Sequence, residues 1–372
     1  MKQRFFLLST VFVFAFAWLI AGPAAYAAEP IVIGVPTSLG FLEGKESHKA
    51  VQMAVSEINA MGGVMVGGEK RLFKVVATDL RDAAAGVPVP EALLGIEKLI
   101  LEQKPTAILV GPFRSEALLA GMDIFAKYKM PMLGTIAMSP GSEAKIKKDP
   151  EKYKYVFRVS LNVIYWVKLL AGTNATLKQD FGFDKVYIMN QDVAWARGTA
   201  GGMEKKVYPS LKMEVVGHDQ FPTGFSDYSS ALMKAKAKGA GVLFTCFDMP
   251  ESGVAPARNF YNNYKKTYGN GIQSGHGPAP SYESVYILKE AIERAGSLDP
   301  DAIVAEIEKT DRKGVMGRIR FDEGHQVVYG IDPAETAVGA FFQWTEKGKR
   351  KIVYPKSLAE GEIVLPPWVK KR

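Results

Sequence analysis

Short loops that follow predicted strands carry the residues best suited to bind a small molecule. In open parallel sheets, ligands bind beyond the carboxyl ends of the strands, where several loops meet. Five predicted strands lead into loops that could contribute to such a site. The candidate binding residues in these loops are Leu42, Glu43, Arg114, Ser115, Ala137, Met138, Ser139, Trp195, Phe247 and Asp248.

Ser115 and Arg114 suggest a site for an anion. Ser115 begins a predicted helix, where its hydroxyl and the free backbone N–H groups can bind a carboxylate. Arg114 can attract the same group or remain exposed to solvent. The alternative for Ser115 is an ordinary helix cap, which needs no ligand.

The second half of the chain offers aromatic rings at the corresponding strand ends. Trp195 follows a predicted strand in a polar loop, where the sequence suggests no core for it to join. It could cover an apolar ligand or stack on a planar one. Phe247 and Asp248 end the last strand of this half and offer a ring and a carboxylate. Core packing is the alternative for such aromatic side chains.

Several enzyme signatures are absent from the sequence. The glycines around Gly44-Lys45-Glu46 do not have phosphate-loop spacing, and neither a dinucleotide fingerprint nor a nucleophile elbow occurs. The single cysteine, Cys246, lies in an apolar run that predicts a buried strand and an inert thiol. The four histidines are far apart and show no metal-ligand spacing. We therefore expect no catalytic residue, metal or cofactor.

Strands and helices alternate along the chain in two successive series, which predicts an α/β protein with two lobes. The first series has strands at Ile31–Pro36, Phe73–Thr78, Ala107–Val110 and Pro131–Thr135, with helices at Glu46–Met61, Pro90–Gln103 and Ser115–Lys129. The second has helices at Val163–Phe181, Thr199–Val207 and Tyr228–Lys238, with strands at Lys185–Asn190, Met213–Asp219 and Val242–Phe247.

The first 27 residues have the pattern of a secretory signal peptide. Lys2 and Arg4 precede an apolar run of about 16 residues, shorter than the ~20 of a transmembrane helix, which is the alternative. Ala25-Tyr26-Ala27 then supplies a cleavage site. Cleavage would leave 345 of the 372 residues and lower the net charge from +8 to +6. The positive charges are spread along the chain, so we expect no nucleic-acid partner.

A series of short motifs then points to a family. In chain order these are Ile33-Gly34-Val35-Pro36, the segment Ala54 to Val64, Leu109-Val110-Gly111-Pro112 with Ser115, the loop Ala137 to Pro140, the loop Asp192 to Gly198, the helix start Ser281 to Tyr286, and the strand Val315 to Asp322. Their order and spacing resemble those of the periplasmic solute-binding proteins of branched-chain amino acid ABC transporters. The resemblance extends from about Ile31 to Trp344, which is nearly the whole mature chain.

This resemblance implies a type I periplasmic binding protein, with two Rossmann-like lobes joined by a three-strand hinge around a cleft. Lobe 1 would comprise residues 28–157 and 253–340, and lobe 2 residues 158–252 and 341–372. Ser115 and the Ala137–Ser139 loop would hold a ligand carboxylate, and Trp195, Phe247 and Asp248 would close over the ligand. The protein would be a monomer that delivers an amino acid or related carboxylate to permease subunits in the membrane.

The sequence departs from the family in two places. Met138 stands where amino-acid binders usually have a hydroxyl side chain. In addition, the segment after Phe247 is too short for a further helix–strand unit, which normally carries the acid that pairs with a ligand ammonium. Lobe 2 is therefore expected to lack one such unit. A carboxylate without an amino group remains possible as the ligand, and a sensory module or an exported enzyme remain alternative functions.

Overall fold

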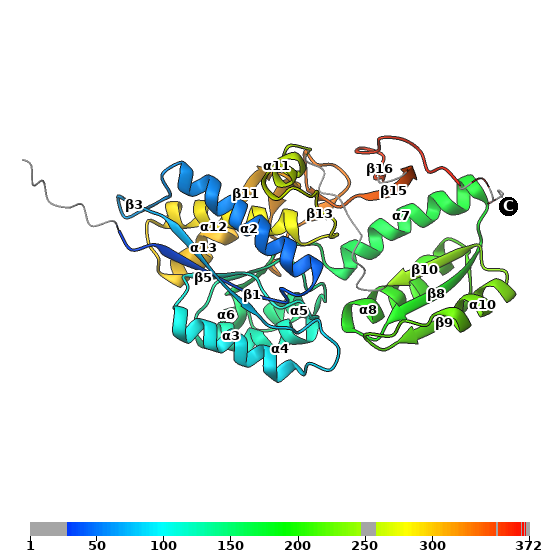
Figure 1. Ribbon diagram of the computed structural model, residues 1–372, viewed down its shortest axis with the longest axis horizontal. Helices are drawn as coiled ribbons and strands as arrows, with labels where there is room; N and C mark the ends of the chain where they lie inside the picture. The colour runs from blue at the N-terminus through cyan, green and yellow to red at the C-terminus, as the bar shows by residue number, and fades with distance from the viewer. Residues whose placement is uncertain (1–27, 247–257, 347–348, 366, 368, 370–372) are drawn as a thin grey trace, which may run out of the picture.

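The computed structural model describes residues 28–246, 258–346, 349–365, 367 and 369. Two bodies lie side by side along the long axis of the molecule (Figure 1). We call the larger body, which contains the first strands of the chain, lobe 1. The smaller body, which contains the strands of the second series, is lobe 2. Each lobe is built around its own parallel sheet.

The sheet of lobe 1 has five parallel strands in the order β4-β1-β5-β6-β7. Nearly every residue of its inner strands is buried, because helices cover both faces of the sheet and leave no solvent-facing side. The strands are β1 (Ile31–Thr37), β4 (Phe73–Asp79), β5 (Ala107–Val110), β6 (Met132–Gly134) and β7 (Val156–Arg158).

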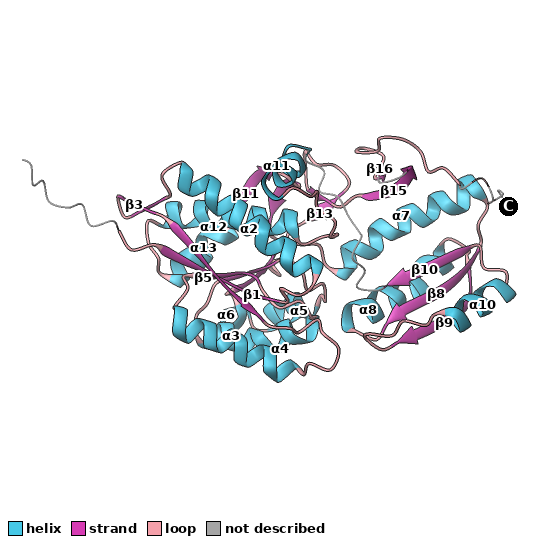
Figure 2. Ribbon diagram, in the orientation of Figure 1, coloured by secondary structure: helices cyan, strands magenta, loops and turns pink. Residues whose placement is uncertain are grey.

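Helices lie on both sides of the strands of lobe 1 (Figure 2). Two hydrophobic clusters hold these helices against the sheet. The larger cluster includes side chains from α2 (Leu42–Ala60), α11 (Arg258–Tyr268), α12 (Pro278–Ala295) and α13 (Pro300–Glu308). The other joins α3 (Val89–Gln103), α4 (Ser115–Lys127), α5 (Gly141–Lys148) and α6 (Pro150–Tyr153). The carboxyl ends of the strands lie between these two layers of helices. The loops that carry the candidate residues follow these strand ends.

Smaller sheets complete lobe 1. A hairpin joins β2 (Val64–Val66) to β3 (Glu69–Arg71). A four-stranded sheet has the order β11-β12-β14-β13, with β11 (Asp311–Gly314), β12 (Gly317–Arg320), β13 (Tyr329–Gly330) and β14 (Ala337–Val338). Isolated bridges link Arg158 to Gln326 and Phe321 to Val327, so this region is tied to the open edge of β7.

Lobe 2 has a three-stranded parallel sheet in the order β10-β8-β9 within the described residues. Its strands are β8 (Lys185–Gln191), β9 (Glu214–Phe221) and β10 (Val242–Cys246). The cluster on one face includes side chains from α7 (Val163–Phe181), α8 (Ala194–Gly202), the π-helix η1 (Met203–Val207) and α9 (Tyr208–Ser210), and the cluster on the other includes α10 (Ser229–Ala237). The hairpin β15 (Phe341–Glu346) and β16 (Lys349–Tyr354) contacts α7.

Two helices begin at least four residues earlier than the sequence predicted, and both shifts involve candidate residues. Helix α2 starts at Leu42, so Leu42 and Glu43 lie in its first turn and not in a loop. The Glu43 carboxylate is favourable there because it faces the positive end of the helix dipole. Gly44 permits the early start, since a Cβ at that position would lie 2.1 Å from the Ser38 carbonyl oxygen. Similarly, α8 starts at Ala194, which places Trp195 in a helix.

Other differences concern burial and strand ends. Leu94 of α3 is apolar, but 68% of its surface is exposed. The apolar segment 337–344 does not form one continuous strand but is divided between β14 and β15. Cys246 is buried as predicted, and this burial raises the pKa of its thiol, which favours the unreactive protonated form. Among the described residues, no helix combines the length and apolar composition needed to cross a membrane.

The Asp301 carboxylate ties α13 to the end of α6 and the start of β7. It accepts hydrogen bonds from the Tyr155 hydroxyl at 2.6 Å, the Lys129 ammonium at 2.9 Å and the Lys154 ammonium at 3.1 Å. These donors hold the pKa of Asp301 well below its ordinary value of 3.8. Because the folded-state pKa is below the unfolded-state value, the ionised carboxylate stabilises the fold above pH 3.8, and this stabilisation is lost as the pH falls toward the folded-state pKa.

We therefore expect Asp301→Asn to lower the free energy of unfolding at pH 7 by about 1 kcal/mol or less, since the side chain is partly exposed. The difference from the wild type should narrow as the pH falls below 3.8. Urea denaturation at several pH values would measure it. Asp184→Asn, at an exposed position just before β8, is the control. A loss that does not change with pH would contradict this account.

Candidate functional site

Ser115 and Ser139 lie in contact at the carboxyl end of the lobe 1 sheet. The Ser139 backbone N–H donates a hydrogen bond of 3.1 Å to the Ser115 hydroxyl oxygen. Ser115 is 1% exposed and is the first residue of α4, whose N-cap residue is Arg114. The hydroxyl thus joins two of the predicted ligand loops and does not serve as a plain helix cap. Within the described residues no acceptor is found for its proton, which can be donated to a carboxylate.

The Arg158 side chain supports the Ala137–Ser139 loop through hydrogen bonds. This role of Arg158 was not predicted from the sequence. Its side chain is 3% exposed, and its Nε donates to a Glu143 carboxylate oxygen at 2.7 Å. Its Nη2 donates to the Ser139 carbonyl oxygen at 2.6 Å and to the Ser142 hydroxyl. A buried ion pair on β7 and α5 therefore fixes the position of the loop.

The middle of this loop is anchored to the other lobe. Ala137 and Met138 are both buried, and the Met138 side chain belongs to the large cluster of lobe 1. The Met138 carbonyl accepts a hydrogen bond of 2.9 Å from the backbone N–H of Val163, the first residue of α7. The loop is thus linked to the start of lobe 2. At Met138 it offers main-chain atoms and a thioether in place of a side-chain hydroxyl.

Asp82 is a second important residue that the sequence analysis missed. It is buried after β4, where it accepts hydrogen bonds from the Ser38 hydroxyl at 2.6 Å and the Arg114 backbone N–H at 2.8 Å. Burial raises the pKa of its carboxyl, although these hydrogen bonds act in the opposite direction. Asp82 therefore connects the loops after β1, β4 and β5. It could have been found by inspecting the end of the second predicted strand in the same way as the others.

The remaining candidates of lobe 1 lie around this network. Arg114 is half-buried, and its Nη1 donates to the Val87 carbonyl at 3.2 Å. Leu42 is half-buried and Glu43 is buried in the first turn of α2. The rings of Phe41 and Phe113, from the loops after β1 and β5, have centroids 5.7 Å apart. The loops that carry these candidates therefore lie close together.

Trp195 lies where the two lobes meet. It is half-buried and packs against the main cluster of lobe 1 and against the cluster that covers the α7 face of lobe 2. The expectation that it has no core to join is therefore wrong. Its neighbour Ala194 donates its backbone N–H to a Glu116 carboxylate oxygen at 3.1 Å, across the lobe boundary. Phe247 and Asp248 lie outside the described residues.

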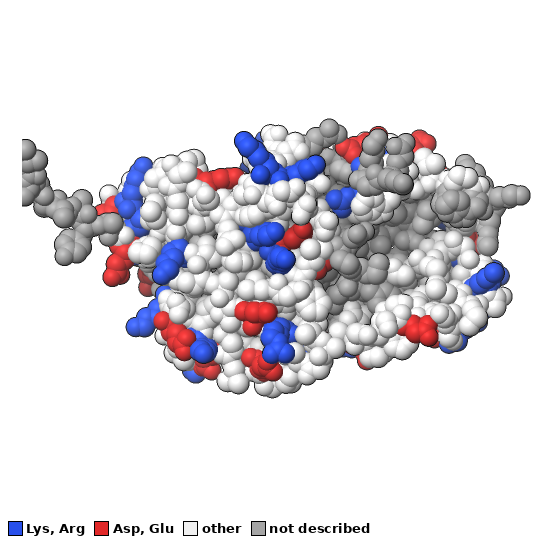
Figure 3. Space-filling model, viewed as in Figure 1, with Lys and Arg blue, Asp and Glu red and all other residues white. Residues whose placement is uncertain are grey.

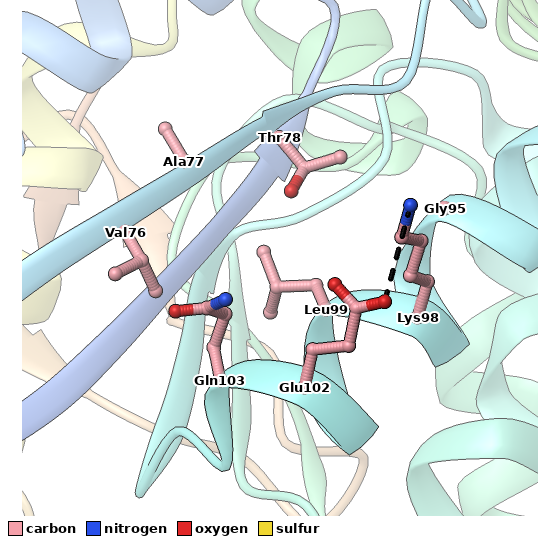
Figure 4. A pocket seen from close by; sticks show the side chains of 8 residues that line it. All are labelled: Val76, Ala77, Thr78, Gly95, Lys98, Leu99, Glu102 and Gln103. Atoms are coloured by element: carbon pink, nitrogen blue, oxygen red, sulfur yellow. Dashed lines mark ion pairs between the residues drawn. The ribbon is translucent and has the colours of Figure 1, made fainter.

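A cavity of about 420 Å³ lies elsewhere, between β4 and α3 (Figure 4). Its lining includes Thr78 and Leu99 but no candidate residue. Lys98 and Glu102, which also line it, form an ion pair of 3.9 Å. On the face seen in Figure 3, acidic and basic side chains are interspersed over lobe 1. Within the described residues, no group of three or more His, Cys, Asp or Glu side chains could hold a metal ion.

Comparison with known proteins identifies the class. A family model described as "Periplasmic binding protein" matches residues 32–255, which is more than half of the chain. The chain therefore belongs to the periplasmic binding protein family. It is 24% identical to the Leu/Ile/Val-binding protein homolog 7 of Brucella melitensis, over 87% of this chain and 90% of that protein. The resemblance seen in the sequence is thus confirmed.

Solved structures show the same two-lobed fold. A putative branched-chain amino acid ABC transporter from Silicibacter pomeroyi superposes with a TM-score of 0.76 at 18% identity, covering 91% of this chain and all of that chain. A branched-chain amino acid substrate-binding protein from Streptococcus pneumoniae, in complex with isoleucine, gives 0.66 at 21% identity, covering 88% and 100%. An R. palustris solute-binding protein in complex with benzoate gives 0.67 at 14% identity, covering 87% and 95%.

These similarities confirm the predicted fold class, a type I periplasmic binding protein with parallel-sheet cores. The Brucella alignment spans 389 positions, more than the 372 residues of this chain, so at some positions the relative has residues and this chain has none.

Proposed function

We propose that this protein is the extracytoplasmic substrate-binding component of an ABC transporter. It binds an amino acid or related carboxylate between the lobes and delivers it to a membrane permease. The observation that carries this proposal is the position of the Ser115–Ser139 contact. These hydroxyl and main-chain donors lie beside the Glu116–Ala194 hydrogen bond that joins the two lobes. The family match supports the class, since relatives of this chain are solute-binding proteins rather than enzymes.

Binding would depend on fixed dipoles more than on a single counter-charge. Ser115, the first turn of α4 and the Ala137–Ser139 loop would hold the carboxylate on lobe 1, with Arg114 adding a positive charge nearby. Trp195 would cover the ligand from lobe 2, together with Phe247 and Asp248. Since a closed cleft excludes water, each of these hydrogen bonds would gain strength on closure.

The lobe boundaries follow from the same proposal. We propose that residues 28–157 and 253–340 form lobe 1 and that residues 158–252 and 341–372 form lobe 2, with a three-strand hinge between them, although Arg158 itself pairs with Gly134 in the sheet of lobe 1. Aromatic packing supports this assignment, because Trp166 of α7 contacts Phe341 of β15 at a centroid distance of 4.8 Å. The mature protein would reach the periplasm after removal of residues 1–27.

A thermal-shift screen of amino acids and organic carboxylates tests the function. It should include L-leucine, L-isoleucine and benzoate, and also the amide of each acid. A true ligand raises the melting temperature by mass action, and its amide should not. If no carboxylate raises the melting temperature, or if amides act as well as acids, the proposed carboxylate site would be wrong.

Ser115→Ala should weaken binding of the best carboxylate by about 1–3 kcal/mol, because it removes a buried hydrogen-bond donor to a charged group. Calorimetry of both proteins would measure the change. Ser210→Ala is a matched control, since the Ser210 hydroxyl donates to the Val207 carbonyl in lobe 2, away from the loops of the proposed site. An unchanged dissociation constant in Ser115→Ala would remove this residue from the site.

A further inference from the structure

Glu116 is a side chain of lobe 1 that binds the backbone of α8 in lobe 2. It follows Ser115 in the first turn of α4 and is about one-third exposed. One carboxylate oxygen accepts the Ala194 backbone N–H at 3.1 Å and lies 3.7 Å from the Arg197 guanidinium. The acceptor belongs to lobe 1, and both donors belong to the first two turns of α8 in lobe 2.

The amino end of α8 needs such a partner. The first N–H groups of a helix have no acceptor within the helix, and a carboxylate there is favoured by the helix dipole. The N-cap residue of α8 is Val193, whose apolar side chain makes no capping hydrogen bond. Glu116 thus supplies from the other lobe the acceptor that the local sequence of α8 lacks.

The charges around Glu116 suit this role. On its own helix, the Arg114 Nε lies 4.0 Å from the second carboxylate oxygen. From lobe 2, Arg197 also pairs with Asp192 at 2.5 Å. Two guanidinium groups therefore face two carboxylates, and a further carboxylate placed at the Ala194 N–H would lie against the charge of Glu116.

We propose that Glu116 is an interlobe cap that stabilises the closed form of the protein. Because separating the lobes breaks the Glu116–Ala194 hydrogen bond, the bond contributes only to closure. Since the Ala194 N–H of α8 already donates to Glu116, the ligand carboxylate stays on the Ser115 side and the remainder of the ligand faces Trp195. The position of the ligand carboxylate rests on the function proposed above, whereas the stabilisation of the closed form concerns the lobes alone.

The test compares Glu116→Ala with the wild type by small-angle scattering without added ligand and by calorimetry with L-isoleucine and with benzoate. We expect a larger radius of gyration for Glu116→Ala and a dissociation constant raised about 3- to 30-fold, the range typical for loss of a helix cap. Glu91→Ala is the matched control, because Glu91 occupies the first turn of α3 and pairs only weakly with Arg81, at 3.8 Å.

The outcomes separate this inference from the proposed function. If the wild type binds either compound while Glu116→Ala changes neither affinity nor radius relative to Glu91→Ala, the interlobe cap is wrong and the binding function stands. If the wild type binds neither compound, scattering alone decides, since an unchanged radius overturns the cap and a larger radius supports it. Thermal melting of each variant verifies that it is folded.

Discussion

Glu143→Ala is expected to lower the free energy of unfolding by about 3–5 kcal/mol, because it leaves the buried Arg158 guanidinium without its carboxylate. The pair is almost fully buried, with the Nε and carboxylate oxygen 2.7 Å apart. Urea denaturation would measure the loss. Glu323→Ala is the control, since the Glu323–Lys147 pair is exposed to solvent and should contribute little to stability.

A double variant sharpens this prediction. If unpaired charge causes the loss, replacing both residues in Glu143→Met/Arg158→Met should recover a large part of the stability lost in Glu143→Ala. A double variant that is much less stable than Glu143→Ala would show that packing, and not charge, dominates. Because Arg158 also holds the Ser139 carbonyl, Glu143→Ala should additionally weaken carboxylate binding.

Phe157→Ala is expected to cost about 3–5 kcal/mol of stability, the usual range for a phenylalanine buried in a core. Phe157 lies on β7 and is 1% exposed. Its ring packs edge-on against Phe321 at 5.1 Å and stacks on His325 at 4.1 Å. It therefore fastens the main sheet of lobe 1 to the segment that follows β12, and its removal should leave a cavity at that junction.

Chemical denaturation of Phe157→Ala tests this role, with Phe225→Ala as the control. Phe225 also contacts two aromatic rings, but 40% of its surface is exposed, so its removal should cost less than half as much. Equal losses for the two variants would show that Phe157 does not make the structural connection assigned to it.

The sequence predicted best those elements whose apolar pattern is continuous and bounded by turn residues. The limits of β5 and α7 agree with the prediction at both ends. In β5 every residue is apolar and buried, and Gly111 and Pro112 follow it. Helix α7 ends at Gly182, which adopts a left-handed conformation with φ of 76° that favours glycine.

The parts that were missed depend on contacts between distant segments. Strand β7 has only three residues, and its identity comes from pairing with β6 rather than from its own pattern. Arg158 would be an unfavourable residue for a buried strand if Glu143 did not pair with it. Trp195 looked isolated because the two clusters that it contacts are assembled from segments far apart in the chain. Such relationships cannot be read from local periodicity.

For the candidate site, the sequence identified the loops better than the individual roles. It placed Ser115 and Ser139 at neighbouring strand ends, and the two residues are in contact. It did not identify Asp82, because the loop after the second strand was not considered. Among the described residues, the sheet of lobe 2 has three strands, and Leu243 of β10 is 47% exposed. The absence of a further helix–strand unit from lobe 2 stays a prediction.

Titration calorimetry with the carboxylate that most raises the melting temperature tests the central claim most directly. The account predicts saturable binding of one molecule per chain, with the compound recovered unchanged from the complex. It also predicts a smaller radius of gyration for the saturated protein. Failure to bind any carboxylate in the panel, or conversion of the bound compound to a product, would contradict the account.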